Sequence, residues 1–305
     1  MFKHLLIPLD GSALAESVLP TAAYLAGVTG ATITLLHVIE HNAPAEVHGE
    51  RHLTDPDAAC VYLGEVAERA FPPEMRLRIT EHVHTVEVGN VARSIVEHSD
   101  EFEPDLIILC SHGSGGLRDF LFGSIAQQVI SLGKTPVMVI EPEGKKVPDN
   151  DAICRLLIPL DGDPGHEAGL PVAADLAKTC GASLHLLMVV PTPDTLTGSQ
   201  AATGRLLPGT TSAMLELSQQ GAVDYLRAKI DGLKQQGLTA AAEVARGDAT
   251  SAIVATAERI GADMIVLGTH GKAGMDAFWS GSITPKIANR TRLPLLLVPV
   301  IEQAA

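Results

Sequence analysis

Short apolar runs alternate with longer stretches of mixed polarity along the whole chain, and turn-forming residues bound most of the runs. Apolar runs of about four to eight residues are typical of strands buried on both faces, and the stretches between them are long enough for helices. The expected strands lie near residues 3–9, 31–39, 79–87, 105–110 and 136–141, and near 154–160, 182–190, 239–246, 263–268 and 294–299. The expected helices lie near residues 13–28, 56–70, 90–101 and 123–132, and near 165–179, 212–236, 248–260 and 282–291. Strands that alternate with helices in this way predict an α/β fold with parallel sheets.

The chain repeats itself once. Residues 5–11 (LLIPLDG) return unchanged as residues 156–162, and Gly123-Ser124 and Pro136 return as Gly281-Ser282 and Pro294. A unit of about 150 residues is too long for a solenoid repeat, so the pattern predicts a duplicated domain. We expect domain 1 at residues 1–143, a linker at 144–152 and domain 2 at 153–305.

Two segments that follow the second strand of each half are rich in residues that favour loops. These are residues 41–55 and residues 191–211, the latter containing Gly, Pro, Ser and Thr. We interpret both as mobile loops that cover a binding site.

A glycine-rich motif follows the fourth strand of the second half. The apolar residues 264–267 lead into Gly268 and Gly271, and Gly281-Ser282 opens the next predicted helix. Glycine lets the backbone approach a bound group, and free N–H groups at a helix start suit an anion. The pattern therefore predicts a phosphate-binding loop at the carboxyl end of a parallel sheet. No Gly-Lys-Ser/Thr follows, and the spacing differs from the dinucleotide fingerprint, so both of those motifs are excluded.

The spacing Gly-x2-Gly-x9-Gly-Ser resembles the ATP-binding motif of the universal stress protein family, and the resemblance covers essentially the whole chain. It implies two tandem doubly wound domains, each an open five-stranded parallel sheet with helices on both faces. Family members of this motif class bind ATP or AMP and act in stress adaptation, generally without a well-defined turnover. The implied protein is an adenine-nucleotide sensor that binds ATP, AMP or ADP, with Mg²⁺ or Mn²⁺ on the phosphates.

The resemblance also implies which residues contact the nucleotide. A carboxylate at Asp10 or Asp161 can accept hydrogen bonds from a ribose hydroxyl or an exocyclic amine, or else it opens the turn before a helix. Val38 and Val189 would meet adenine through their backbone groups, or else they are core valines. The expected contacts in the second half are Pro159, Leu160, Asp161, Val189, Leu267, Gly268, His270, Gly271, Gly281, Ser282 and Ile283. Those in the first half are Pro8, Leu9, Asp10, Val38, Leu109, Cys110, Gly113, Gly123, Ser124 and Ile125.

The first half departs from the family motif at one position, where Cys110 replaces the glycine found at Gly268. A cysteine adds atoms where the family backbone lies near the ribose, so it either weakens binding or is a small buried residue. We therefore expect the second half to hold the better site. His112 and His270, which lie between loop glycines, are interpreted as loop anchors, because no nucleophile accompanies them in a known motif.

Composition limits the kind of core, the partners and the location that we expect. Hydrophobic residues make up 46% of the 305 residues and aromatic ones only 3%, so aliphatic side chains must fill the core. The net charge of −14 argues against nucleic acid or an anionic membrane as a partner. The sequence contains no apolar run of about 18 residues, no signal-peptide pattern and no Cys-x-x-Cys, which favours a cytoplasmic protein with reduced thiols.

The twelve histidines raise the question of a metal site. His48 and His52 are four residues apart, and His82 and His84 share one face of a predicted strand, but no Cys or carboxylate spacing completes a site. We expect no metal site built by the protein alone, and no catalytic residues. The sequence offers no Walker lysine, general base or acidic cluster, so binding is favoured over catalysis, with at most weak ATP hydrolysis.

Two other functions stay open. An adenylating enzyme of the related adenine-nucleotide α/β group usually has a Ser-Gly-Gly type loop after the first strand, whereas this chain has Asp10-Gly11-Ser12. A nucleotide-free scaffold or interaction protein is the other alternative, and the cysteine in the first motif supports it.

The final strand of each half, residues 137–140 and 295–298, is strongly apolar and would lie at a sheet edge. Exposed edges of this kind promote association. Members of the family pair these strands across a dimer. We therefore expect the two halves to pair them within one chain as a pseudo-dimer, and a further homodimer is left open.

Overall fold

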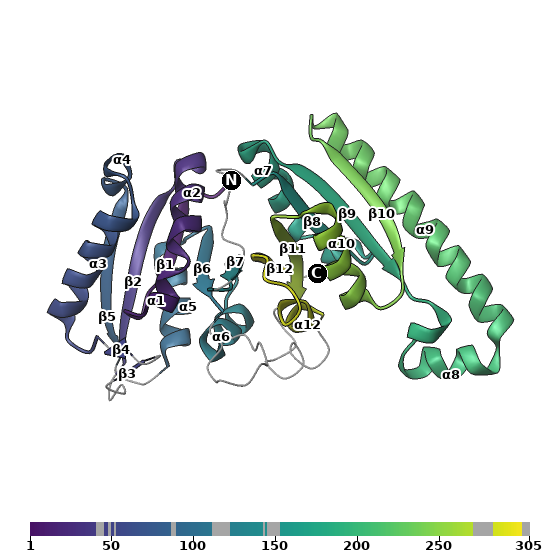
Figure 1. Ribbon diagram of the computed structural model, residues 1–305, viewed down its shortest axis with the longest axis horizontal. Helices are drawn as coiled ribbons and strands as arrows, with labels where there is room; N and C mark the ends of the chain where they lie inside the picture. The colour runs from purple at the N-terminus through teal and green to yellow at the C-terminus, as the bar shows by residue number, and fades with distance from the viewer. Residues whose placement is uncertain are drawn as a thin grey trace.

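The computed structural model describes residues 1–40, 46–47, 50–51, 53–86, 90–111, 123–142, 144, 153–270 and 283–300. Two similar halves lie side by side and share one long sheet (Figure 1). Within these ranges, every helix is too short or too polar to cross a bilayer.

Both halves follow the predicted alternation of strands and helices. The first half contains β1 (His4–Pro8), α1 (Ala13–Glu16), α2 (Leu19–Thr29), β2 (Thr32–Glu40), β3 (Glu46–Val47), β4 (Glu50–Arg51), α3 (Pro56–Ala70), α4 (Pro73–Arg76), β5 (Ile79–Val86), α5 (Val91–Phe102), β6 (Leu106–Cys110), α6 (Ser124–Leu132) and β7 (Val137–Ile140). The second contains β8 (Arg155–Leu160), η1 (Pro164–His166), α7 (Gly169–Cys180), β9 (Ser183–Val190), η2 (Pro193–Thr195), α8 (Gly198–Leu206), α9 (Pro208–Gln235), β10 (Ala240–Arg246), α10 (Ala249–Ile260), β11 (Met264–His270), α12 (Thr284–Ala288) and β12 (Leu295–Val300).

The sheet has ten strands in the order β10-β9-β8-β11-β12-β7-β6-β1-β2-β5. Neighbouring strands are parallel within each half, and β12 pairs with β7 in the antiparallel direction, with Leu296 opposite Met138. The pairing of the two final strands that the sequence predicts is therefore present. It joins the two expected five-stranded sheets into one and leaves β5 and β10 at the outer edges.

Two apolar layers cover the two faces of the sheet. Successive residues of β1 alternate between them, since Leu5 and Ile7 belong to one buried cluster and Leu6 to the other. The repeated β8 does the same with Leu156 and Leu157. Strands buried on both faces read as continuous apolar runs, which is why the strand predictions agree closely with the structure.

The predicted helix 13–28 is broken in the structure into α1 and α2. Pro20 lies at the second position of α2, where the missing N–H of proline costs no hydrogen bond. The predicted helix 165–179 is divided in the same way into η1 and α7, and Pro171 lies in the first turn of α7. The prolines therefore start new helices inside stretches that the apolar pattern treats as continuous.

The interpretation of residues 191–211 as a mobile loop is wrong. This segment forms η2, α8 and the first turn of α9. Pro193 and Pro208 lie in the first turn of η2 and α9, and Thr192 forms a reciprocal capping box with Thr195. The same residue types that favour turns also favour helix starts, and composition alone does not separate the two. In the first half, the structure describes only a short β3–β4 pair between residues 41 and 52.

Candidate functional site

The expected site residues of the first half meet at the carboxyl ends of three neighbouring strands. β1 lies between β2 and β6, and all three are parallel. Asp10, Val38 and Cys110 follow or end these strands and so lie along one edge of the sheet. In the second half β8 lies between β9 and β11, which brings Asp161, Val189 and Gly268 together in the same way.

Each half also has a topological switch point beside its first strand. From β1 the chain continues to β2 on one side, and returns later to β6 on the other side. The same reversal occurs at β8, with β9 on one side and β11 on the other. Connections that leave in opposite directions open a crevice above the strand ends, where open α/β sheets bind ligands.

In the first half, the Asp10 carboxylate shapes the turn that follows β1. Its Oδ1 accepts hydrogen bonds from the Ser12 N–H at 2.9 Å and the Ser12 hydroxyl at 2.6 Å. The Ser12 hydroxyl in turn caps α1 by accepting from the Ala15 N–H at 3.1 Å. Gly11 between them has a φ of 90°, a left-handed conformation that favours glycine. The interpretation of this aspartate as a turn-opening acid is therefore confirmed for one of its oxygens.

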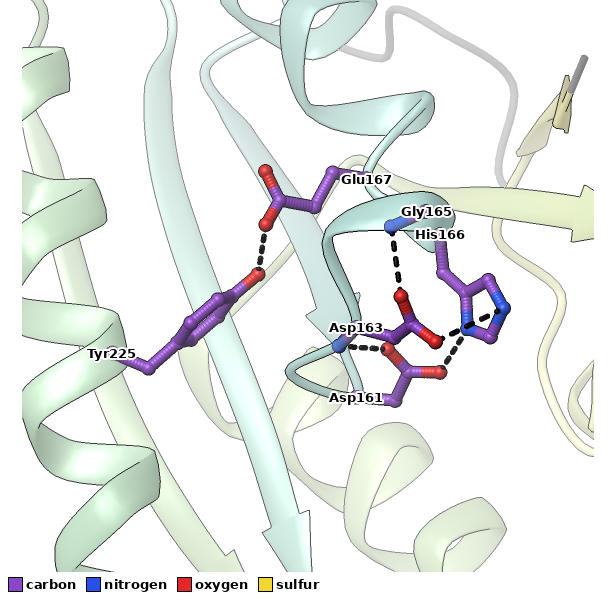
Figure 2. A network of polar contacts seen from close by, with 6 residues as sticks. All are labelled: Asp161, Asp163, Gly165, His166, Glu167 and Tyr225. Carbon is purple, nitrogen blue, oxygen red and sulfur yellow. Dashed lines mark hydrogen bonds and ion pairs between the residues drawn. The ribbon is translucent and has the colours of Figure 1, made fainter. Parts of the chain in front are cut away.

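In the second half, Asp161 lies in a polar network that Figure 2 shows. Its Oδ1 accepts a hydrogen bond from the Asp163 N–H at 2.9 Å, and its Oδ2 lies 2.5 Å from His166 Nδ1. The side chain of His166 also approaches the Asp163 carboxylate at 3.7 Å. Asp161 is 58% exposed, so this carboxylate faces the solvent above the strand ends.

This network shifts the pKa values of Asp161 and His166 in opposite directions. Partial burial works against ionisation of Asp161, but the hydrogen bonds from His166 and from the Asp163 N–H outweigh it and lower the pKa of Asp161. The hydrogen bond to Asp161 raises the pKa of His166. The loop therefore favours an ionised carboxylate beside a protonated imidazole at mildly acidic pH.

Glu167 ties this loop to the long helix α9. Its two oxygens accept hydrogen bonds from the Tyr225 hydroxyl at 2.6 Å and from the Lys229 ammonium at 2.5 Å. Figure 2 shows the tyrosine reaching across to the loop from α9. The carboxylate is 18% exposed, which makes the pair less screened than a surface ion pair.

Gly268 lies where the chain itself leaves no space for a side chain. A Cβ on Gly268 would lie 2.5 Å from the His166 carbonyl oxygen, a backbone atom that cannot move alone. Gly169 at the start of α7 is also close, because its own Cβ would lie 3.3 Å from the Gly268 nitrogen. The backbone of η1 therefore approaches Gly268 closely, so this position needs a glycine even without a ligand.

Cys110 occupies the corresponding place in the first half and is 5% exposed. Burial, and to a smaller extent the Asp10 carboxylate, raises the pKa of the thiol. A thiol with a raised pKa stays protonated and behaves as a small apolar group. The interpretation of Cys110 as a small buried residue is therefore confirmed, and its effect on a ligand stays a prediction.

The remaining expected residues fall into three groups. Leu9, Val38, Leu109 and Leu267 are buried behind the strand ends. Pro8, Pro159, Leu160, Val189, Gly123 and Ile283 are half-buried at or near the same edge, and Ser124 and Ile125 are exposed in the first turn of α6. Gly113, Gly271, Gly281, Ser282, His112 and the side chain of His270 lie outside the described residues.

No motif in the sequence marks His166, Glu167 or Tyr225 as site residues. The repeat itself marks one of them, because Glu16 and Glu167 occupy the same position in the two halves. Glu16 contacts Arg69 of α3 at 2.5 Å, as Glu167 contacts Lys229 of α9. A glutamate repeated shortly before an apolar helix indicates that both halves form an ion pair there, although spacing along the chain does not identify its partner.

Comparison with known proteins gives a consistent result. The model of the universal stress protein family matches residues 1–141 and again residues 153–299. A universal stress protein of Mycolicibacterium smegmatis is 23% identical over 320 aligned positions, which cover 96% of each chain. Universal stress protein A homolog 1 of Coxiella burnetii is 30% identical over 148 residues, covering 46% of this chain and 96% of that protein.

A solved structure shows the same fold over the whole chain. The crystal structure of a universal stress protein from Archaeoglobus fulgidus is 20% identical in sequence and has a TM-score of 0.65. The match covers 98% of this chain and 97% of that one, so the arrangement of both halves is shared. With one family model matched in each half, the chain belongs to the universal stress protein family.

Proposed function

We propose that this protein binds an adenine nucleotide at the carboxyl ends of its central strands and acts as a sensor or regulator. The observation that carries the proposal is the switch point in each half, where an aspartate follows the first strand and the first residue of the motif, Cys110 or Gly268, lies on the neighbouring strand. Ribose hydroxyls suit the carboxylate, and phosphates suit N–H groups at the start of the helix that follows the motif.

The second half is proposed as the tighter site. It has the complete Gly-x2-Gly-x9-Gly-Ser motif, and Asp161 is more than half exposed at the strand ends. His166 already pairs with one oxygen of this carboxylate, so a ribose hydroxyl would share or replace that contact. In the first half Asp10 accepts two hydrogen bonds from Ser12 and lies beside a buried thiol.

A protein that binds without turnover suits the site better than an enzyme. Polar side chains near the described strand ends pair with one another, as Asp161 does with His166 and Glu167 with Lys229. A divalent ion would bind through the phosphates of the nucleotide, because such ions keep several water ligands and use few protein carboxylates.

The first test uses the full chain as purified. Denaturation followed by mass spectrometry should release an adenine nucleotide, and isothermal titration of nucleotide-free protein should show ATP or AMP binding with GTP as the control. Absence of released nucleotide together with no heat of binding for any adenine nucleotide would refute the proposal and favour a nucleotide-free scaffold.

The second test uses matched variants of the aspartate. Asp161→Asn keeps the size of the side chain and removes its charge, and should weaken ATP binding by about tenfold, since a charge-assisted hydrogen bond contributes roughly 1.5 kcal/mol or more. His166→Gln is the control, because it removes the same internal pair without changing the carboxylate. Equal affinity of wild type and Asp161→Asn would show that the carboxylate only shapes the turn.

A further inference from the structure

Three histidines meet at the outer edge of the first half, on the opposite side of β2 from β1. His82 and His84 lie on β5, and His98 lies on α5, which packs over the sheet. One ligand nitrogen from each ring lies within 4.8 Å of the other two, and the Nε2 atoms of His82 and His98 are 3.1 Å apart.

The fold explains why these side chains converge. β5 is an edge strand whose only described strand neighbour is β2, and His82 and His84 lie opposite Leu36 and Val38. Those two residues belong to the apolar layer beneath α5, so both histidines point toward that helix. His98 is 5% exposed on the inner face of α5 and completes the cluster from above.

One hydrogen bond fixes the tautomer of His98. Its Nδ1 lies 2.7 Å from the backbone carbonyl oxygen of Ser94, and a carbonyl can only accept. The proton of the neutral ring therefore stays on Nδ1, and the lone pair of Nε2 points toward His82. A backbone carbonyl that holds the distal ring nitrogen in this way is the usual support of a metal-binding histidine.

The surroundings limit the access of water to the three imidazoles. The ring of Phe102 covers one side of the cluster, with its centroid 5.0 Å from that of His82 and 5.4 Å from that of His98. The pair of His82 and His84 is half-buried, which leaves a route for an ion.

We propose that His82, His84 and His98 form a transition-metal site, with Zn²⁺ as the ligand and a fourth position open to water. Neutral imidazole suits Zn²⁺, and three histidines plus an open position is an established zinc geometry. Zinc–nitrogen bonds of about 2.0–2.1 Å in a tetrahedron place the nitrogens roughly 3.4 Å apart, close to the separation of His82 and His98. A rotation of the half-exposed His84 side chain would bring the third nitrogen to the same distance.

The second half offers an internal control, because it has the same edge without the cluster. Leu187 repeats Leu36, and its partner on β10 is Glu243, which therefore corresponds to His82. Glu243 binds Arg259 of α10 and lies 3.4 Å from His185. The corresponding edges of the two halves thus carry different side chains, an ion pair in the second half and three imidazoles in the first.

The test uses the full chain without a histidine tag, stripped of metal. Co²⁺ should bind with a stoichiometry of one per chain and give the visible absorption of imidazole coordination, and Zn²⁺ should displace it and raise the unfolding temperature. His82→Asn and His84→Asn should each weaken Co²⁺ binding by more than tenfold, because each removes a ligand, and loss of a group that only supports a ligand already costs about 10–100-fold. His185→Asn, at the corresponding edge of the second half, should leave binding unchanged.

Two outcomes would overturn the proposal. One is the absence of stoichiometric Co²⁺ and Zn²⁺ binding by the wild type, which would leave the cluster as a packing feature. The other is binding that survives both histidine variants but is lost in Cys60→Ser or Cys154→Ser, the exposed thiols. Zinc protection of His82 and His84 from diethyl pyrocarbonate, mapped by mass spectrometry in the wild type, gives a readout that does not depend on how the variants fold.

Discussion

The two halves differ where the helical segment that follows the first strand packs against the strand that carries the motif, which is α7 on β11 in the second half and the α1–α2 segment near β6 in the first. In the second half Gly169 meets Gly268, and the His166 carbonyl fills the space where a Cβ would lie. In the first half the repeat places Val18 and Cys110 at these positions, and both are buried. Two glycines let backbone meet backbone in the second half, whereas in the first half the side chains of a valine and a cysteine occupy the corresponding positions.

Gly268 is small for two separate reasons. The family motif suggests that a small residue there admits a ligand, and the His166 carbonyl oxygen also occupies the place where a Cβ would lie. Swapping the residues between the halves therefore tests packing and binding together, and measurements of stability and of affinity tell them apart.

The largest expected effect concerns the start of the helix after the motif. Gly281→Val places a branched side chain where phosphates would approach and should remove most high-affinity ATP binding, by about a hundredfold for a clash of roughly 2.8 kcal/mol. Gly123→Val, the matched change in the first half, should matter less. Isothermal titration of both variants measures the ranking, and the reverse order would make the first half the tight site.

The residue swap at the fourth strand should have the next largest effect. Gly268→Cys forces the strand away from the His166 carbonyl and should lower the free energy of unfolding by about 1–3 kcal/mol. Cys110→Gly should also lose stability through the removal of a buried thiol, yet it should strengthen ATP binding in the first half. Urea unfolding and titration calorimetry check the two readouts, and unchanged affinity in Cys110→Gly would show that the thiol does not obstruct the ligand.

The glutamate that anchors the first loop should have a smaller effect. Glu167→Gln keeps acceptors for Tyr225 and Lys229 but removes the charge, and should cost about 1 kcal/mol of unfolding free energy. Glu16→Gln should cost less, because its partner Arg69 is 55% exposed. Denaturant unfolding of the two variants against wild type measures the difference, and an equal cost would mean that partner exposure is not decisive.

The smallest expected effect is a dependence on pH that only the second half has. The pKa of His166 is raised from 6.5, so its pairing with Asp161 contributes fully below that value and is lost as the pH rises through the raised pKa. The pKa of Asp161 is lowered, so its contribution is lost only in strong acid, as the pH falls through the lowered value.

The measurement is the difference in unfolding free energy between wild type and His166→Gln at pH 6 and at pH 8.5. It should be larger at pH 6, by roughly 0.5 kcal/mol or less, because both side chains are at least a third exposed. Ala15 holds the corresponding position in the first half and has no titratable group. Because Ala15 is buried, Ala15→Gln should cost stability, but the cost should be the same at both pH values, which makes it the control for the pH dependence. A larger difference at pH 8.5 would contradict the assignment of the charged pair.

Local patterns in the sequence determined the strands and the duplication, and the resemblance to the family added the pairing of the apolar final strands. Strands buried on both faces have continuous apolar sequences, and each pattern occurs once in each half. The predicted bounds of β6 and β11 therefore differ from the observed ones by at most two residues. Within each half, the strand-end residues could be placed on one edge from the same reasoning, Asp10 with Val38 and Asp161 with Val189, because parallel strands bring their carboxyl ends together.

Only the tertiary structure decided what depends on contacts between distant segments. Two of the helices at residues 191–211, η2 and α9, begin at prolines whose helical role depends on their surroundings. Glu167 contacts Lys229 only because α9 packs across the sheet. The cluster of His82, His84 and His98 joins a strand to a helix that follows it, and spacing along the chain carries no information on which helix residue faces an edge strand. Sequence periodicity fixes the face of an element, but the partner of that face is set by how the elements pack.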